Sequence, residues 1–308
     1  TGAAIGPARA AIGASLTAFG SFDKPELSGT ATLKAASAGA PAAARFFDAV
    51  KAPLALRAGL LASFPADLTL KLGAPTGEGA QSLEATGTLG PSTIDASAQI
   101  DSGFLRALDG RFKLEVDLKS PDATGMTAQL GLGDVHVFPE GEPMHLAGVI
   151  EGDVGASLSA TLRAEGGGDS LGFSGNVVVT DPDRFTGQGT LKAALAEPTA
   201  LAARLGVEGL ALPSLSGSAT LEFAGAQSIT LTGINGTSGG GSFSGQLTFR
   251  KPAETGQVSG KLVIASADVA SLVRALLGPA ALLSTGDLWP DGPFSTGLAP
   301  RSTSGRIE

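Results

Sequence analysis

Two histidines are the only side chains in this sequence whose ordinary pKa lies near neutrality, where general acid–base catalysis is most effective. His136 lies in an alternating Val-His-Val stretch, and His145 stands at the start of another predicted strand. The sequence contains no cysteine, no HxxxH spacing and no GxSxG nucleophile elbow. We therefore predict no catalytic residues, no metal ion and no cofactor. A Ser-His-Asp triad assembled only by the fold remains the open enzymatic alternative.

Glycine clusters are the second kind of motif that could do chemistry, because glycine-rich loops can hold phosphates. The glycine runs at 166–168 and 239–241 lack GxGxxG or Walker spacing and precede no predicted helix. They predict hairpin turns. Asn235 and Gly236 match a glycosylation sequon with the next residue, but Asn-Gly is also a strong hairpin signal, and we predict a turn there as well.

The overall composition narrows the class of partner. A net charge of −8 and an isoelectric point near 4.9, without any basic cluster, argue against nucleic acid. The charged fraction is only 16% and the mean hydropathy is +0.23, so the chain is unusually apolar. The most apolar stretch, 269–283, is broken by Arg274 and Pro279 and is shorter than a bilayer span. The first residues resemble the end of a preceding unit, and we expect the chain to be a fragment of something longer.

The elements that would position any site are strands with one apolar face. Apolar and polar residues alternate in the predicted strands 189–194, 218–223, 228–232 and 242–249, which is the period of a half-buried strand. The predicted apolar lining comprises Leu114, Val116, Leu118, Leu158, Leu162, Leu221, Phe223, Phe243, Leu247, Phe249, Leu262 and Ile264.

The strands belong to a long repeat. Similar segments open at Gly29, Gly110, Gly187 and Gly260, spaced 81, 77 and 73 residues apart. A fixed period in a chain of strands predicts one elongated array. The predicted units are the end of a preceding repeat at 1–28, repeat units at 29–109, 110–186 and 187–259, and a truncated unit at 260–308.

A short apolar helix is predicted after the opening strand of each unit. Pro41, Pro121 and Pro198 follow their opening glycines by 12, 11 and 11 residues, and proline is tolerated in the first helical turn. Helices are expected over 41–50, 198–205 and 268–277. Such short helices are marginal alone and are expected to plug the apolar face at intervals.

The alternation leaves two interpretations open. The apolar faces could pack on one another in a closed sandwich or solenoid core, which alternation alone favours. Alternatively, one long sheet could curl into a gutter whose apolar lining holds acyl chains.

Three segments carry a resemblance to a known family: GRFKLEVDLKSPDATGMTAQLG from Gly110, GKLVIASADVASLVRALLG from Gly260, and GDLWPDGPFSTG at 286–297. Each combines a Gly-led strand with an Asp- or Pro-initiated helix, or forms a Trp-x-x-x-Pro-Phe junction. This order resembles the AsmA-like family of Gram-negative bacteria, the relatives of TamB, over nearly the whole chain.

The resemblance implies a taco-shaped antiparallel β-groove with a short helix in each repeat. It implies a non-enzymatic, bridge-like transfer protein that binds phospholipid acyl chains and conducts phospholipid across the periplasm for outer-membrane homeostasis. It also implies an inner-membrane anchor, absent from this sequence, and contact with both membranes through parts outside this chain. The alternative that we keep is a structural or adhesive cell-surface β-solenoid with a closed core.

Overall fold

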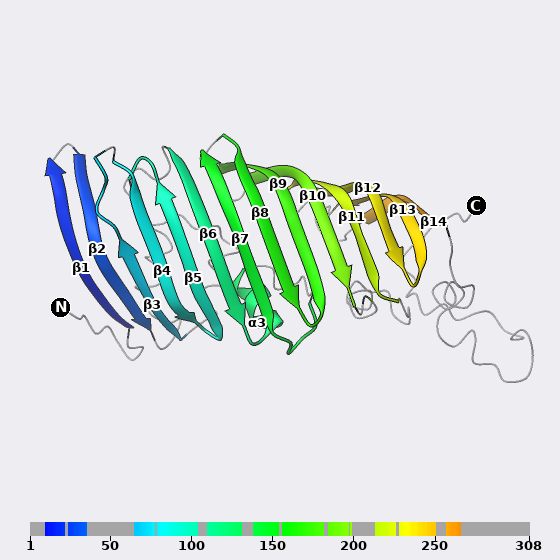
Figure 1. Cartoon of the computed structure of the whole chain (residues 1–308), viewed down its shortest axis with the longest axis horizontal. Helices are drawn as coiled ribbons and strands as arrows, with labels where there is room; N and C mark the ends of the chain where they lie inside the picture. Colours follow the sequence, from blue (N-terminus) through cyan, green and yellow to red (C-terminus); the bar gives the residue numbers. More distant parts are fainter. Residues whose placement is uncertain are drawn as a thin grey trace, which may run out of the picture.

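The described residues form a single antiparallel sheet. The computed structural model describes residues 10–21, 24–35, 65–77, 79–103, 110–130, 138–153, 156–181, 184–196, 198, 213–225, 228–250 and 257–265. Fourteen strands follow one another in sequence order, each hydrogen-bonded to its chain neighbours (Figure 1). The sheet does not close on itself, since β1 and β14 are its two edges. The expectation of a mainly β, antiparallel fold is confirmed.

The strands are seven to thirteen residues long. They are β1 (Ala10–Ser21), β2 (Lys24–Ala35), β3 (Ala66–Leu72), β4 (Gln81–Leu89), β5 (Ser92–Ile100), β6 (Arg111–Ser120), β7 (Met144–Asp153), β8 (Leu158–Gly166), β9 (Asp169–Asp181), β10 (Arg184–Leu195), β11 (Leu215–Ala224), β12 (Ser228–Ser238), β13 (Gly241–Arg250) and β14 (Gln257–Ile264). One helix, α3 (Ala123–Gln129), is present among the described residues.

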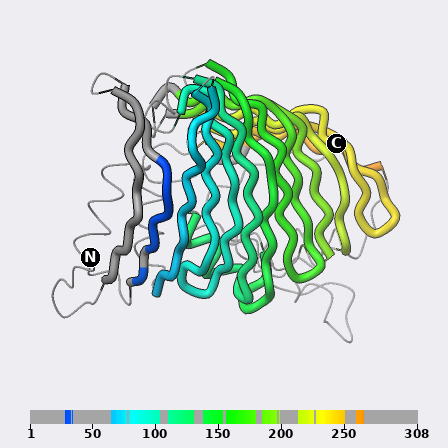
Figure 2. Tube along the Cα trace, turned by 60° about the vertical axis from the view of Figure 1, so that its left-hand side comes forward, coloured from blue at the N-terminus to red at the C-terminus, as the bar shows by residue number. Residues whose placement is uncertain are grey.

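The sheet curls along its length. Figure 1 shows the strands succeeding one another along the long axis, and Figure 2, turned from that view, shows the later strands bending behind the earlier ones. Two glycines within strands have a backbone conformation that other residues disfavour. Gly87 and Gly152 have φ near +140°, a region that L side chains rarely adopt, and a Cβ there would collide with the neighbouring strand's backbone.

The two long rims of the sheet, formed by the strand ends, differ. We call the rim where β6 ends and β7 begins the helix rim, because α3 lies there, and the opposite one the loop rim. At the helix rim, tight two-residue turns join β4 to β5, β8 to β9 and β12 to β13. The connections 36–65, 121–143 and 196–214 leave the same rim after β2, β6 and β10. Both kinds of connection therefore recur every four strands.

The predicted unit openings share this spacing. Gly29 lies in β2, Gly110 directly precedes β6, Gly187 lies in β10 and Gly260 lies in β14. A new predicted unit thus opens at every fourth strand: β2, β6, β10 and β14. The division at 28, 109, 186 and 259 itself stays a prediction, and the sheet is continuous through all four boundaries.

Helix α3 begins at Ala123, two residues after Pro121, so this proline precedes the N-cap and does not stand in the first turn as predicted. Asp122 is the N-cap, and its carboxylate accepts hydrogen bonds from the Thr124 and Gly125 N–H groups at 3.1 and 3.0 Å. Gln129 fixes the other end, because its Nε2 donates to Leu89 O at 2.7 Å. A seven-residue helix is unstable alone, so these contacts with the sheet maintain it.

The remaining predicted helices are not tested. Residues 41–50, 199–205 and 268–277 lie outside the described residues, as do His136 and residues 286–297 of the resemblance.

One turn prediction is wrong. Asn235 and Gly236 lie inside β12, where they pair with both β11 and β13, and the chain reverses at Gly239 and Gly240 instead. The cause is a bulge at Gly233, whose φ is +58°, where the register with both neighbours shifts. The bulge shifts the alternation by one residue, and β12 continues to Ser238, past the end of the alternating sequence pattern. The predicted turns at 166–168 and 239–241 are confirmed.

Candidate apolar binding face

Strand register places most of the large apolar residues of β3–β14 on one side of the sheet, with exceptions such as Val149, Val178 and Val263. Directly paired residues share a face, and so do residues two apart along a strand. Following the pairs from β3 to β14 gives rows of apolar residues and glycine that run across the sheet. The first row, nearest the helix rim, comprises Leu68, Gly87, Ile94, Leu118, Leu146, Ala164, Leu171, Ala193, Gly217, Gly236, Phe243 and Ile264.

The third row is equally unbroken. It comprises Leu72, Leu83, Ala98, Leu114, Ile150, Ala160, Gly175, Gly189, Leu221, Leu231, Leu247 and Gly260. A second row lies between these two, and a fourth lies nearest the loop rim. We call the surface formed by the four rows the apolar face.

All twelve lining residues predicted from the sequence lie on the apolar face. In row order they are Leu118, Phe243 and Ile264; Val116, Leu162 and Leu262; Leu114, Leu221 and Leu247; and Leu158, Phe223 and Phe249. Their role in holding a lipid stays a proposal.

Most of these side chains are half-buried rather than buried. Along β6, residues 112, 114, 116 and 118 are half-buried, whereas Lys113 and Glu115 on the other face are exposed. On β14, Leu262 and Ile264 are 47% and 52% exposed. The apolar face therefore retains surface that a ligand can contact.

The apolar face is larger than the apolar patches that ordinary monomeric proteins expose. Rows two residues apart are separated by about 7 Å and strands by about 4.8 Å, so four rows from β3 to β14 cover roughly 20 by 50 Å. That is on the order of 1,000 Å², whereas ordinary monomers expose apolar patches of only a few hundred Å². A surface of this size requires an occupant or a cover.

Helix α3 covers one part of it. Ala123 and Met126 of the helix are each 1% exposed and form a buried cluster with Phe138 and Met144. Residues of four adjacent strands pack against this cluster: Leu118, Leu146, Ala164 and Leu171, all from the first row. The helix thus covers the apolar face at the helix rim of β6–β9.

Large side chains lie close over glycines on this face. A Cβ on Gly236 would lie 2.5 Å from Phe243 Cζ, and one on Gly148 would lie 2.5 Å from Leu162 Cδ2. Gly187 stands in the same relation to Phe223, whose Cε1 is 2.9 Å from the Cβ position. These contacts are possible only because glycine has no Cβ. The glycines therefore allow the neighbouring side chains to lie close to the sheet.

Three phenylalanines form a cluster near the loop rim. Phe223 lies edge-to-face with Phe173 and with Phe185, at ring-centroid distances of 6.1 and 6.0 Å. Phe185 is 37% exposed. The sequence analysis missed Phe173 and Phe185. The alternation of Leu171 with Phe173 in β9 was an available signal for the first.

The opposite face is mainly polar and carries ion pairs. Asp117 bonds Lys119 Nζ at 2.9 Å and His145 Nε2 at 2.8 Å. The hydrogen bond from Lys119, followed by that from His145, holds the pKa of the Asp117 carboxyl below its usual value. The side chain of His145 is 38% exposed, and no hydroxyl group among the described residues bonds it. This pair lacks the nucleophile that a triad needs.

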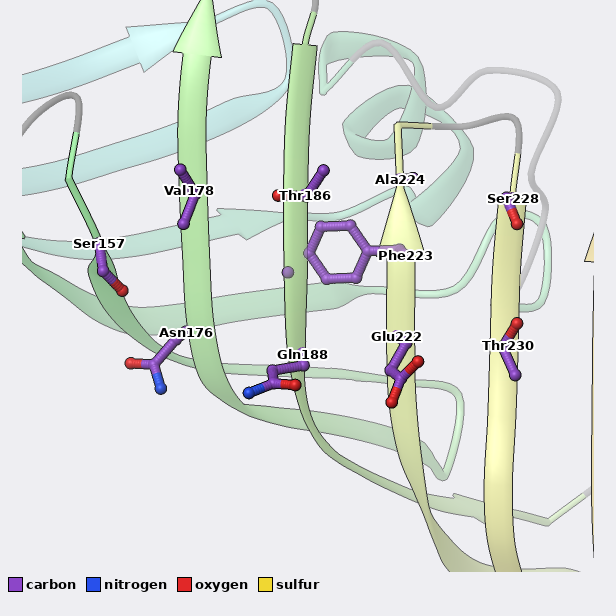
Figure 3. Close-up of a pocket in the computed structure, with 11 residues that line it drawn as sticks. Ser157, Asn176, Val178, Thr186, Gln188, Glu222, Phe223, Ala224, Ser228 and Thr230 are labelled. Atoms are coloured by element: carbon purple, nitrogen blue, oxygen red, sulfur yellow. The ribbon is translucent and has the colours of Figure 1, made fainter.

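A shallow hollow of about 530 Å³ lies on the polar face of β9–β12. Asn176, Gln188, Glu222 and Thr230 form a row across its floor (Figure 3). Glu222 is the one titratable residue among the described residues that line it. A single carboxylate without a second acid or base gives no support for hydrolytic chemistry. In Figure 3, α3 and earlier strands lie behind β10 and β11, on the side of the sheet away from these polar groups.

No group of three or more His, Asp or Glu side chains within the described ranges is arranged to hold a metal ion. Nor does any helix in that part of the chain have the length and apolarity of a membrane span.

Comparison with protein-family models, curated proteins and solved structures found no match to this chain.

Proposed function

We propose that this chain is a non-enzymatic lipid-binding protein whose apolar face holds and conducts phospholipid acyl chains. The observation that carries the proposal is the unbroken rows of apolar residues, which run from strand to strand along an open, curled sheet. A catalytic site needs convergent polar groups at one point, whereas this face repeats the same apolar surface along its whole length.

The dimensions suit a hydrocarbon chain. The hydrocarbon core of a bilayer is about 30 Å thick, so one acyl chain spans about 15 Å. The roughly 20 Å between the first and fourth rows accommodates such a chain lying along the strands. Each ~100 Å² of apolar surface removed from water contributes about 2.5 kcal/mol. Because every strand offers similar side chains, a bound lipid meets no single deep site and can move along the sheet.

The recurrence of connections every four strands supports a repeating groove with one short helix per unit. In this proposal α3 represents the helix of its unit, and corresponding helices follow β2, β10 and β14. The array would cross the periplasm and supply phospholipid for outer-membrane homeostasis. Its inner-membrane anchor and its contacts with the two membranes would lie in segments outside this chain.

The alternative function, a structural or adhesive β-solenoid, receives less support. Solenoid coils place strands in parallel and close around a dry core. Here neighbouring strands are antiparallel, and side chains of the apolar face retain exposure.

Charge substitution distinguishes the two functions. We expect Val116→Lys and Leu221→Lys each to lower the amount of bound lipid while the fold survives, because a charge disrupts the apolar rows locally and an open groove allows the ammonium group to be hydrated. Thr220→Lys, one residue from Leu221 on the exposed polar face, is the matched control and is expected to leave lipid binding unchanged. Native mass spectrometry of the purified chain, followed by mass spectrometry of its organic extract, measures lipid occupancy, and circular dichroism measures folding. Unfolding of both variants would support a closed core, and a folded wild-type chain without lipid would refute the proposal.

A further inference from the structure

Buried hydrogen bonds hold helix α3 in place at both of its ends. Gln129, its last residue, accepts a hydrogen bond from Ser92 Oγ at 2.5 Å and donates one to Leu89 O at 2.7 Å. The Gln129 and Ser92 side chains are only 7% and 2% exposed, and buried polar groups are costly to separate. Asp122 caps the other end of the helix. A ligand on the apolar face therefore meets α3 as a fixed boundary.

The helix shortens the open part of the apolar face on four consecutive strands. The buried cluster that α3 forms packs on the first-row side chains of β6, β7, β8 and β9. On these strands the second to fourth rows remain beyond the helix, and three rows span about 14 Å. No described helix packs on Phe243, the first-row residue of β13, where four rows span about 20 Å.

This difference matters for a hydrocarbon chain that lies along the strands. One acyl chain of a bilayer spans about 15 Å, so it fits within four rows but fills or slightly exceeds three. Each methylene group left without apolar cover weakens retention by about fourfold. Because α3 covers four neighbouring strands, a lipid that moves along the sheet must cross the shortened part.

We infer that α3 acts as a length filter, in that the strands beside it retain phospholipids with short acyl chains better than those with long ones. The inference rests on the proposed function and adds a property of the ligand, the length of its hydrocarbon. It assigns the selection to the helix, since the third row is leucine both beside the helix, at Leu114, and away from it, at Leu247. The selection requires no movement of α3.

These two leucines provide a matched pair of probes. Leu114 lies in β6 and Leu247 in β13, and both side chains are half-buried. Leu114→Trp and Leu247→Trp are made separately in a chain that carries Trp289→Phe. Each is loaded with phosphatidylglycerol brominated in its acyl chains, because bromine quenches indole fluorescence only at close range. Unlabelled dilauroyl, dipalmitoyl or distearoyl phosphatidylglycerol then competes with the brominated lipid.

We expect the dilauroyl lipid to relieve quenching more effectively than the distearoyl lipid at position 114. The ratio of the two effects should be at least about fourfold larger there than at position 247, which corresponds to one methylene group left in water. Comparing the two positions cancels the tendency of each lipid to stay in its own vesicles. Equal ratios, or a larger ratio at position 247, would overturn the length filter while leaving lipid binding intact. Absence of quenching in both variants would refute the proposed function, and with it this inference.

Removal of the helix is the second test. Ser120 and Met144 pair directly, as do Leu89 and Ser92, whose strands are joined by a two-residue turn. Residues 121–143 are therefore replaced by Gly-Gly, which gives β6 and β7 the same kind of connection as β4 and β5. In the Leu114→Trp background, we expect the preference for short chains to disappear. A preference that persists in this variant, with circular dichroism showing a folded sheet, would overturn the inference.

Discussion

Gly187 tests whether the close packing of side chains over glycines on the apolar face is a real property of the protein. In the structure, a Cβ at this position would lie 2.9 Å from Phe223 Cε1, closer still to Cζ, and 2.8 Å from Asn176 O. Ordinary contacts of a Cβ begin near 3.4 Å. In Gly187→Ala, therefore, the Phe223 ring must move away from the sheet, and the β9 backbone at Asn176 must also shift slightly.

The energetic cost has two opposing parts. Alanine restricts the unfolded chain and favours a strand over glycine by about 0.5–1 kcal/mol. Overpacking costs about 1–3 kcal/mol. We expect a net loss of about 1–2 kcal/mol for Gly187→Ala. Gly172→Ala is the control, because Gly172 lies on the polar face of β9 and its Cβ would meet only Leu162 O at 3.9 Å. We expect that variant to be as stable as the wild type or up to about 1 kcal/mol more stable.

Urea unfolding followed by circular dichroism measures both variants, and Phe223→Ala completes a double-mutant cycle. If the displaced ring causes the loss, Gly187→Ala should cost at least about 1 kcal/mol less in the Phe223→Ala background. Equal costs in both backgrounds would show that the Phe223 ring does not lie over Gly187, and the description of a ring held close to the sheet would be wrong.

Two further predictions concern groups that hold the sheet and helix. Asp122→Ala should destabilise the protein by about 1–2 kcal/mol in urea unfolding, because the carboxylate caps α3 and also accepts a hydrogen bond from the Gly141 N–H group at 3.3 Å. Asp122→Asn should retain most of the stability, because an asparagine side chain can also cap a helix. Equal losses in the two variants would argue against a capping role. The Asp117 carboxyl, whose folded-state pKa is lowered, should stabilise the fold above the usual aspartate pKa and lose that contribution as pH falls through the lowered value. An NMR titration should find this low pKa and find it raised in Lys119→Met, and an unchanged pKa in that variant would contradict the assigned cause.

The faces of the strands could be predicted from the sequence, whereas their bends could not. Alternation identifies the face because successive side chains of a strand point to opposite sides, and Val116 or Leu247 could be assigned without knowing any neighbour. The register between strands depends on turn geometry, and only the Gly-rich turns gave a usable signal. Asn235-Gly236 was misplaced because a bulge at Gly233 shifts the alternation, and a two-residue motif does not reveal such a shift.

The glycines were only partly understood from the sequence. Their abundance predicted turns, yet Gly148, Gly187 and Gly236 lie within strands on the apolar face. Each of these glycines makes room for a large side chain on the neighbouring strand. Which side chain that is depends on the register between the strands, and the sequence does not reveal this register. For the same reason the cluster of Phe173, Phe185 and Phe223 could not be predicted, since it joins residues of three strands.

A single sheet with one apolar face cannot be stable in water without a second layer on that face. Within the described residues, α3 supplies such a layer over the helix rim of β6–β9. The rest of the face requires either other parts of the chain or a ligand. A protein cover would be expected to interlock with standing side chains, as interiors do. On the observed floor, Leu162, Phe223 and Phe243 instead lie close over Gly148, Gly187 and Gly236, so these three side chains stay near the sheet. Side chains held near the sheet offer a partner less to interlock with, and this property suits a mobile hydrocarbon chain better than a fixed protein layer.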